Sequence, residues 1–169
     1  MSNAMTAKVE GNVLILERVF HAPRELVFKA FSEAEHLKRW WGPRGWELTY
    51  CDIDFRPGGR WHYCMKCMDK NLGDFYGMES WGKSIYGDIV DGEKIDYTDY
   101  FSDPEGNEVP GMPAADATNT FLDYEGKTKL VCKTRYVSPE ELQKVLDMGM
   151  EQGISQTWDR LEEHLESLQ

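Results

Sequence analysis

Two cysteines stand at a spacing found in metal sites and in redox pairs. Cys64 and Cys67 form a C-x-x-C motif, which binds zinc when a second pair of ligands completes a tetrahedral set. The other two cysteines, Cys51 and Cys132, are single residues within predicted strands. A thioredoxin-type pair would open a helix, whereas this motif stands at a strand end that enters a loop. We therefore predict free thiols, with no bound metal and no cofactor.

Histidine is the other residue type that could carry acid–base chemistry near neutral pH. None of the four histidines belongs to a motif such as G-x-S-x-G or H-E-x-x-H. Only His62 falls within the predicted sheet, where it could act as a general base if it faced a cavity beside a carboxylate. A hydrogen-bonded or exposed sheet histidine is the more common situation. His36 and His164 are expected to be solvated on polar helix faces, and His21 is isolated.

Aromatic residues make up 12% of the chain, with six tryptophans. This is more than a small core needs, so some rings are expected to line a cavity, although solid packing is the alternative. Trp61, Tyr63 and Met65 share one face of a predicted strand while His62 and Cys64 share the other, and the two-residue period leaves open which face points inward. The predicted ligand-binding residues are Trp40, Trp41, Trp46, Trp61, Tyr63, Trp81, Tyr97, Phe101, Phe121, Met150, Ile154 and Trp158.

Charge argues against nucleic acid as a partner. Thirty acidic residues against 19 Lys and Arg give a formal net charge of -11, which repels phosphate backbones and anionic lipids. The segment 37–46 mixes cations with three tryptophans, but so few cations do not make a phosphate-binding surface. Arg24, Lys38, Arg39 and Arg44 could instead contact an acidic partner protein.

The order of predicted elements favours an α+β fold. Residues 12–20 read as a strand, and two short helices follow between Pro23 and Gly42. Six further β-rich runs separated by turn residues then imply an antiparallel meander. They cover residues 46–55, 60–65, 80–89, 95–101, 117–124 and 128–137.

The C-terminal segment is predicted to be helical. Ser138, Pro139 and Glu141 form a helix start with a capping box. Glycines weaken the middle, so one helix is expected to end near Met148 and a longer one to begin around Met150. Its acidic residues, among them Asp159, Glu162 and Glu163, are expected to face water. Gly153 is predicted to lie where this helix passes closest to the sheet or to a ligand, because a mid-helix glycine costs about 1 kcal/mol relative to alanine.

A chain of 169 residues is expected to form one domain over residues 5–169. Residues 1–4 precede a second methionine and read as the remnant of an expression tag. No apolar run approaches the roughly 18 residues that a membrane crossing needs, and no signal peptide is recognisable. We expect a cytoplasmic protein without membrane insertion.

Three segments in order resemble one known family: RVFHAPRELVFKAFSEAEHLKRWWGP, CDIDFRPGGRWHY and GMEQGISQTWDRLEEHL. They resemble the family named for the C-terminal domain of the activator of heat shock protein 90 ATPase, within the START-like (SRPBCC) superfamily. The resemblance covers nearly the whole chain from Val13 to Leu168. It implies a helix-grip fold like that of Bet v proteins, in which a curved antiparallel sheet of about six or seven strands wraps around a long C-terminal helix. The chaperone activator has an additional N-terminal domain, which a chain of this length is not expected to contain.

The favoured hypothesis is a binding protein that holds an apolar or aromatic small molecule between the sheet and the C-terminal helix, without covalent chemistry. The resemblance also brings lipid binding and stress response into consideration. One alternative is a START-like enzyme of the cyclase, aromatase or hydrolase type, which would need a polar dyad inside the cavity, such as His62 or Tyr63 with Asp54 or Glu79. The other, suggested by the family name, is a module that interacts with heat shock protein 90. A homodimer is a further candidate assembly.

Overall fold

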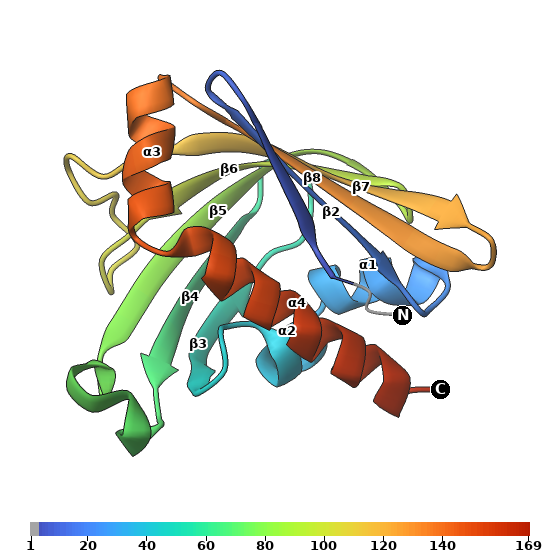
Figure 1. Cartoon of the computed structure of the whole chain (residues 1–169), viewed down its shortest axis with the longest axis horizontal. Helices are drawn as coiled ribbons and strands as arrows, with labels where there is room; N and C mark the ends of the chain where they lie inside the picture. The colour runs from blue at the N-terminus through green and yellow to red at the C-terminus, as the bar shows by residue number, and fades with distance from the viewer. Residues whose placement is uncertain (1–3) are drawn as a thin grey trace.

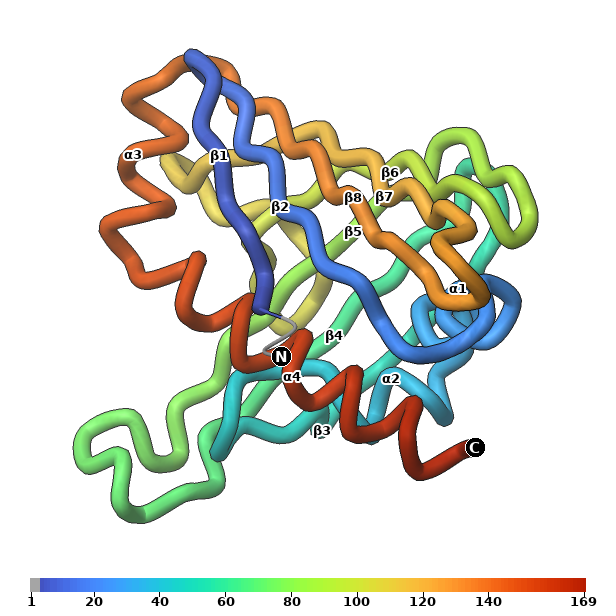
Figure 2. Tube along the Cα trace, turned by 45° about the vertical axis from the view of Figure 1, so that its right-hand side comes forward, coloured from blue at the N-terminus to red at the C-terminus, as the bar shows by residue number. Residues whose placement is uncertain are grey.

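A single antiparallel sheet dominates the computed structural model, which describes residues 4–169. Eight strands pair in the order β1-β2-β8-β7-β6-β5-β4-β3, and the sheet curves around the C-terminal helix α4 (Figure 1; Figure 2). The strands are β1 (Thr6–Glu10), β2 (Val13–Phe20), β3 (Trp46–Ile53), β4 (Arg60–Cys67), β5 (Glu79–Val90), β6 (Lys94–Phe101), β7 (Ala115–Tyr124) and β8 (Lys127–Tyr136). The helices are α1 (Arg24–Ser32), α2 (Ala34–Trp40), the 3-10 helix η1 (Lys70–Phe75), α3 (Pro139–Asp147) and α4 (Met150–Ser167).

This architecture confirms the predicted α+β helix-grip fold, with one strand more than expected. The additional strand is β1, which forms a hairpin with β2 across Gly11 and Asn12. All five of its side chains are exposed, so the segment lacks the alternation of apolar and polar residues that identifies a half-buried strand. The predicted tag remnant falls on residues 1–3, which are outside the described part of the chain, and on Ala4; it stays a prediction.

The predicted boundary between the two C-terminal helices is confirmed. Ser138 Oγ accepts a hydrogen bond from the Glu141 amide at 3.2 Å, and Pro139 occupies the first turn of α3. Gly149 adopts a left-handed φ of 83° between α3 and α4, a conformation that glycine adopts without the steric cost of a Cβ atom. The chain therefore turns here, and α4 crosses the open side of the sheet (Figure 1).

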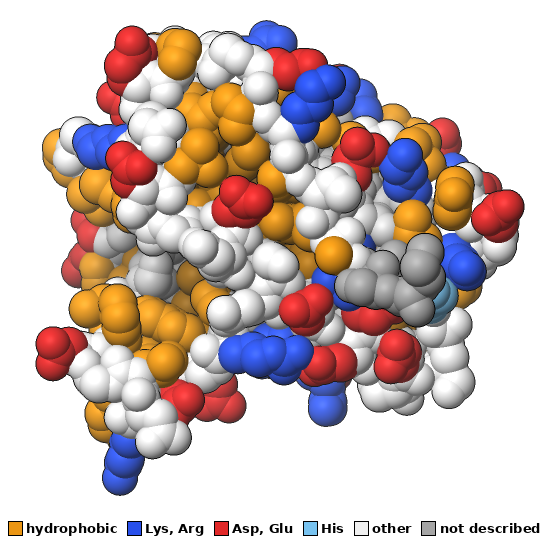
Figure 3. Space-filling view, in the orientation of Figure 1, with side chains coloured by type: hydrophobic (Ala, Val, Ile, Leu, Met, Phe, Trp, Pro, Cys, Tyr) orange, Lys and Arg blue, Asp and Glu red, His pale blue; other side chains and the backbone are white. Residues whose placement is uncertain are grey.

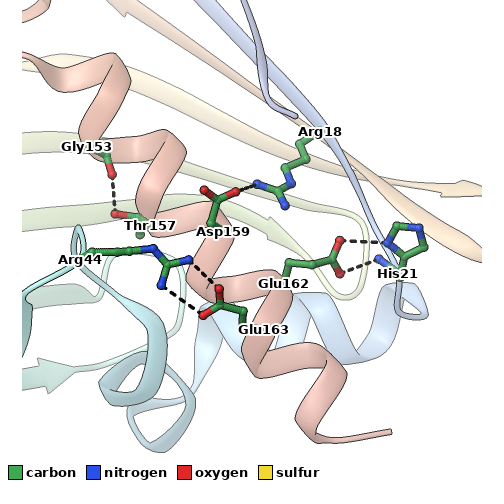
Figure 4. Close-up of polar contacts among 8 residues, drawn as sticks. All are labelled: Arg18, His21, Arg44, Gly153, Thr157, Asp159, Glu162 and Glu163. Carbon is green, nitrogen blue, oxygen red and sulfur yellow. Dashed lines mark hydrogen bonds and ion pairs between the residues drawn. The ribbon is translucent and has the colours of Figure 1, made fainter. Parts of the chain in front are cut away.

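Three acidic residues of α4 that the sequence predicted would face water form pairs with residues of other elements. Asp159 accepts a hydrogen bond from the buried Arg18 of β2 at 2.6 Å, and Glu162 contacts His21 at 3.0 Å. Figure 4 shows both pairs and a third, between Glu163 and Arg44. The predicted solvation is wrong for Glu162, which is 8% exposed, because it packs against His21 from a distant part of the chain. It is confirmed for Asp159 and Glu163, whose side chains are 45% and 59% exposed although each pairs with an arginine.

Two further predictions about helix residues were wrong. His36 and His164 were expected to be solvated, but they lie between α2 and α4 with Nδ1 of the first 2.9 Å from Nε2 of the second. Gly153 was expected to mark a close approach, yet a Cβ atom built there meets only the ring of Pro43, at an ordinary 3.7 Å. The glycine carbonyl instead accepts a hydrogen bond from Thr157 (Figure 4).

The packed core lies under α1 and the second half of α4. Trp158 packs edge-on against Phe20 at a ring distance of 5.8 Å. Phe28 and Phe31 of α1 contact Phe121 of β7 at 5.3 and 5.4 Å. These rings fill the inner side of the sheet under α1 and the second half of α4.

Candidate functional site

The structure decides which face of β4 points inward, a question that the sequence left open. Trp61 and Tyr63 stack on each other at 4.3 Å and contact Trp41, on the face of the sheet turned toward α4. We call this the inner face. His62 and Cys64 point to the opposite, outer face, because successive side chains of a strand alternate.

Strand β6 carries a row of incompletely buried residues on the inner face. Ile95 is 2% exposed within the core, whereas Tyr97, Asp99 and Phe101, which follow at intervals of two, are only partly buried. At Tyr97 and Asp99, β6 is paired with β5 on one side and with β7 on the other, whereas Phe101 is paired with β5 alone. The side chains of Tyr97 and Asp99 therefore reach solvent through space above the inner face. Figure 3 shows this face hollowed between α3, α4 and the β1–β2 hairpin, with hydrophobic side chains inside the hollow.

Asp99 lies at the centre of this region among small neighbours. Its directly paired residues are Ser84 of β5 and Ala115 of β7. The Ser84 hydroxyl donates to Asp99 Oδ1 at 3.1 Å. Neighbouring strands are about 4.8 Å apart, so the residues directly beside the carboxylate on both sides are small.

Larger rings stand one step further from the carboxylate in each direction. Tyr97 and Phe101 lie two residues before and after Asp99 on β6. Tyr86 of β5 is paired with Tyr97, and Tyr63 of β4 is level with Phe101 two strands away. Trp61 of β4 and Tyr136 of β8 are level with Asp99, each two strands away from it. At about 3.3 Å per residue and 4.8 Å per strand, these positions are roughly 7 to 12 Å from the Asp99 backbone. We call this arrangement the aromatic cup; its members are Trp61, Tyr63, Tyr86, Tyr97, Phe101 and Tyr136.

Burial shifts the acid–base properties of the cup. It raises the pKa of the Asp99 carboxyl to about 6, which the Ser84 hydrogen bond partly opposes. Burial also raises the pKa of Tyr63 and Tyr97 well above the usual value, and the nearby Asp99 charge adds to that effect. The tyrosines are therefore neutral hydrogen-bonding groups, and the carboxylate is the group that changes charge near neutral pH.

A second polar group lies beside the cup. Asn119 of β7 is 6% exposed, and its side-chain oxygen has no hydrogen-bond partner among the described residues. Its paired neighbour on β8 is Cys132, whose Sγ is 4.0 Å from the Tyr97 hydroxyl. A buried acceptor without a partner costs free energy, so this position has capacity for a donor that the chain does not supply.

The structure brings some of the predicted ligand-binding residues together and separates others. On the inner face it places Trp61, Tyr63, Tyr97 and Phe101, with Trp41 in contact with the first two, and Met150 and Ile154 pack against the core from α4. The fully packed positions are Trp40, Phe121 and Trp158.

The two remaining tryptophans lie elsewhere. Trp46 lies on the edge strand β3 next to Phe75 of η1. Trp81 lies on the outer face against Tyr50 and His62.

The dyad considered for an enzyme is not assembled inside the sheet. His62 is buried on the outer face, where its Nε2 lies 3.1 Å from the Asp103 carbonyl oxygen. Asp54 is in an exposed turn and pairs with Arg56, and Glu79 is exposed with its carboxylate bonded to Trp81 Nε1. Of the four groups, only Tyr63 points inward.

The C-x-x-C motif occupies the last four residues of strand β4, so it stands at the end of a strand that enters a loop, as predicted. A spacing of three residues in a strand puts Cys64 and Cys67 on opposite faces. Their thiols donate weakly to the carbonyls of Met65 and Asp69, respectively. This geometry cannot bring both sulfurs to one metal ion, and residues 4–169 contain no group of three or more His, Cys, Asp or Glu that could hold one.

Sequence reasoning missed Asp99 as a site residue. A signal was present, because Ile95, Tyr97, Asp99 and Phe101 alternate with the more polar series Lys94, Asp96 and Thr98. A carboxylate in phase with apolar residues is unusual on the buried face of a strand.

Outside the inner face, two depressions of about 500 and 440 Å³ flank the second half of α4. Arg160 contributes to both, and charged residues such as Arg44, Lys38 and Glu163 line them. Their polar walls do not suit an apolar ligand. Within the described part of the chain, no helix has the length and apolar character needed to cross a membrane.

Comparison with known proteins agrees with the fold and with the resemblance seen in the sequence. Residues 21–166 match the family described as Activator of Hsp90 ATPase homolog 1-like protein. None of the curated proteins matches the chain.

Several solved structures share the fold. The crystal structure of protein Ms6760 from Mycobacterium smegmatis is 27% identical, with a TM-score of 0.84 over 95% of this chain and 96% of that one. A solution structure from Staphylococcus epidermidis is also 27% identical, with a TM-score of 0.78 over 98% and 96% of the two chains. The AHSA1 protein of Silicibacter pomeroyi, at 20% identity and a TM-score of 0.73 over 93% and 99% of the chains, supports the fold alone.

Proposed function

The chain belongs to the family of Activator of Hsp90 ATPase homolog 1-like proteins, and from this premise we propose that it binds an apolar or aromatic small molecule over the inner face of its sheet. The observation that carries this proposal is the partial exposure of Tyr97 and Asp99, at positions where β6 is paired on both sides. Apolar walls with a few polar groups are the usual features of a small-molecule site.

Binding without covalent chemistry fits the inward groups. Asp99 and the neutral tyrosines can fix the orientation of a ligand, but among the described residues no histidine or cysteine thiolate stands beside Asp99 to form a nucleophile–base pair. Burial raises the pKa of the Cys132 thiol on β8 and so keeps it protonated. The enzyme alternative therefore has less support than the binding hypothesis.

A substitution on the sheet that fills the hollow tests the binding proposal. Ala115 is 6% exposed on the inner face beside Asp99, so Ala115→Leu extends a side chain into the space. The probe is N-phenyl-1-naphthylamine, whose fluorescence rises in apolar surroundings. We expect a saturable signal with the unmodified protein and a loss of affinity of at least about tenfold in the variant.

Lys133→Leu adds the same side chain to the exposed outer side of β8 and should leave probe binding unchanged. Because Ala115→Leu could also disturb the sheet, Ile154→Trp fills the hollow from α4 and should give the same loss. Absence of saturable binding to the unmodified protein, or equal binding by both filled variants, would reject the proposal.

Chaperone interaction is the second candidate, and it has its own structural feature. The segment around η1 exposes the apolar side chains of Met68, Leu72, Phe75, Tyr76 and Met78, each 37–54% exposed. Clustered exposed apolar residues often mark protein-binding surfaces. Titration of heat shock protein 90 with the unmodified chain and with Phe75→Ser tests this candidate, which fails if neither binding nor a change in ATPase rate is found.

A further inference from the structure

The surroundings of Asp99 indicate what kind of polar group the inner face selects. Asp99 is the carboxylate at the centre of the aromatic cup, with a hydroxyl hydrogen bond from Ser84 on one oxygen. No Lys, Arg or His of residues 4–169 forms an ion pair with it. A carboxylate in such a place normally requires a counter-charge.

The described strands do not supply a spare cation on this face. Arg18 is the one basic residue whose side chain points inward from these strands, and it is already bonded to Asp159 at 2.6 Å. The side chains of Lys83 and Lys94 point to the outer face, and Lys94 pairs with Asp96. The charge of Asp99 is therefore left for a ligand to balance.

The rings around Asp99 also favour a cationic ligand. An organic cation is attracted to the faces of Trp and Tyr rings within about 6 Å of their centres. The small residues Ser84, Ala115 and Gly82 separate the carboxylate from these rings. An ammonium group above Asp99 could therefore contact several ring faces while its apolar body extends toward Met150 and Ile154.

We propose that the aromatic cup selects an organic cation, an ammonium group on an apolar body, with Asp99 as its counter-charge and the surrounding rings as its walls. This inference rests on the proposed function and narrows it to a class of ligand. A neutral alcohol of the same shape would lose the charge–charge and cation–ring attractions, and an acid would be repelled by Asp99.

Three probes of matched shape test the inference on the complete chain: 4-phenylbutylamine, 4-phenylbutan-1-ol and 4-phenylbutyrate. Dissociation constants are measured by calorimetry at about pH 7.5, where a carboxyl of pKa about 6 is largely ionised. We expect the amine to bind at least about tenfold more tightly than the alcohol, and the acid more weakly than both.

The variant Asp99→Asn keeps the shape and removes the charge. It should bring the amine to the affinity of the alcohol while leaving alcohol binding unchanged. Asp96→Asn is the matched control. Like Asp99, Asp96 accepts a hydrogen bond from a side-chain hydroxyl, that of Thr118 at 2.7 Å, but it points to the outer face. The control should keep the full preference for the amine.

The outcomes separate this inference from the proposed function. If the alcohol binds as tightly as the amine, or if the preference persists in Asp99→Asn, the cation inference is overturned while apolar ligand binding stands. If none of the three probes and no N-phenyl-1-naphthylamine binds, both are rejected. Binding of the amine to Asp99→Asn at the affinity of the unmodified protein would place the cation elsewhere and also overturns the inference.

Discussion

The ring of Tyr63 lies directly over Gly82, its partner on the neighbouring strand. A Cβ atom built on Gly82 would be 2.5 Å from the tyrosine hydroxyl oxygen and from the ring carbon that carries it. Glycine in a strand interior weakens the strand, but here it lets an aromatic ring lie across the backbone. This contact sets the position of the Tyr63–Trp61 stack, and with it one wall of the aromatic cup.

Gly82→Ala should therefore destabilise the protein. The added methyl group overlaps the Tyr63 ring, and overpacking of this kind costs about 1–3 kcal/mol. Gly87→Ala on the same strand is the control, because its Cβ would meet the Asp96 side chain at an ordinary 3.5 Å. Urea denaturation of both variants measures the difference, and equal stabilities would show that the Tyr63 ring moves away at no cost.

Gly153→Ala should have the opposite effect. The position has room for a methyl group and lies within α4 at an ordinary helical conformation. Replacing a helical glycine by alanine at such a site stabilises a protein by about 0.4–1 kcal/mol, chiefly by restricting the unfolded chain. The free energy of unfolding from denaturant curves tests this expectation. A destabilised variant would restore the close-approach prediction made from the sequence.

Asp99→Asn should stabilise the empty protein in a pH-dependent way. The folded state holds the proton on Asp99 up to about pH 6, against an ordinary value of 3.8, so the stability associated with the neutral acid is lost as the pH rises through 6. The full shift corresponds to at most about 3 kcal/mol, and partial exposure reduces it to about 1–2 kcal/mol.

We therefore expect the free energy of unfolding of Asp99→Asn to be about 1–2 kcal/mol higher than that of the unmodified protein at about pH 8. At about pH 4 the two free energies should be equal. Thermal and urea unfolding at both values give the comparison. Asp96→Asn should show no such gain, because it removes the partner of Lys94 on the outer face. An equal gain in stability at both pH values would contradict a raised pKa for Asp99.

The contact between His36 and His164 should make the protein sensitive to acid. Burial, the neighbouring His36 and Arg39 lower the pKa of His164 below its ordinary 6.5. The unfolded chain therefore binds a proton at a pH where folded His164 does not, and stability falls as the pH drops below about 6.5 and through the lower folded value. His164→Gln should reduce this loss between about pH 7 and 5. An unchanged pH profile would mean that other groups cause the acid sensitivity.

The sequence alone determined the order and type of most elements. Turn residues and two-residue alternation located seven of the eight strands, and the Ser138–Glu141 cap located the start of α3, because these signals are local in the chain. β1 was missed, since an edge strand with all of its side chains exposed carries no hydrophobic alternation.

The tertiary structure alone decided what those elements enclose. Alternation groups Trp61 with Tyr63 and Tyr97 with Asp99, but which group faces inward depends on how distant strands pair and on which face α4 covers. The pairs Arg18–Asp159 and His36–His164 join residues 141 and 128 positions apart, beyond the reach of any local pattern. Asp99 becomes a candidate site residue for the same reason: most of the rings around it, and its small neighbours, come from other strands, and only strand pairing places them beside the carboxylate.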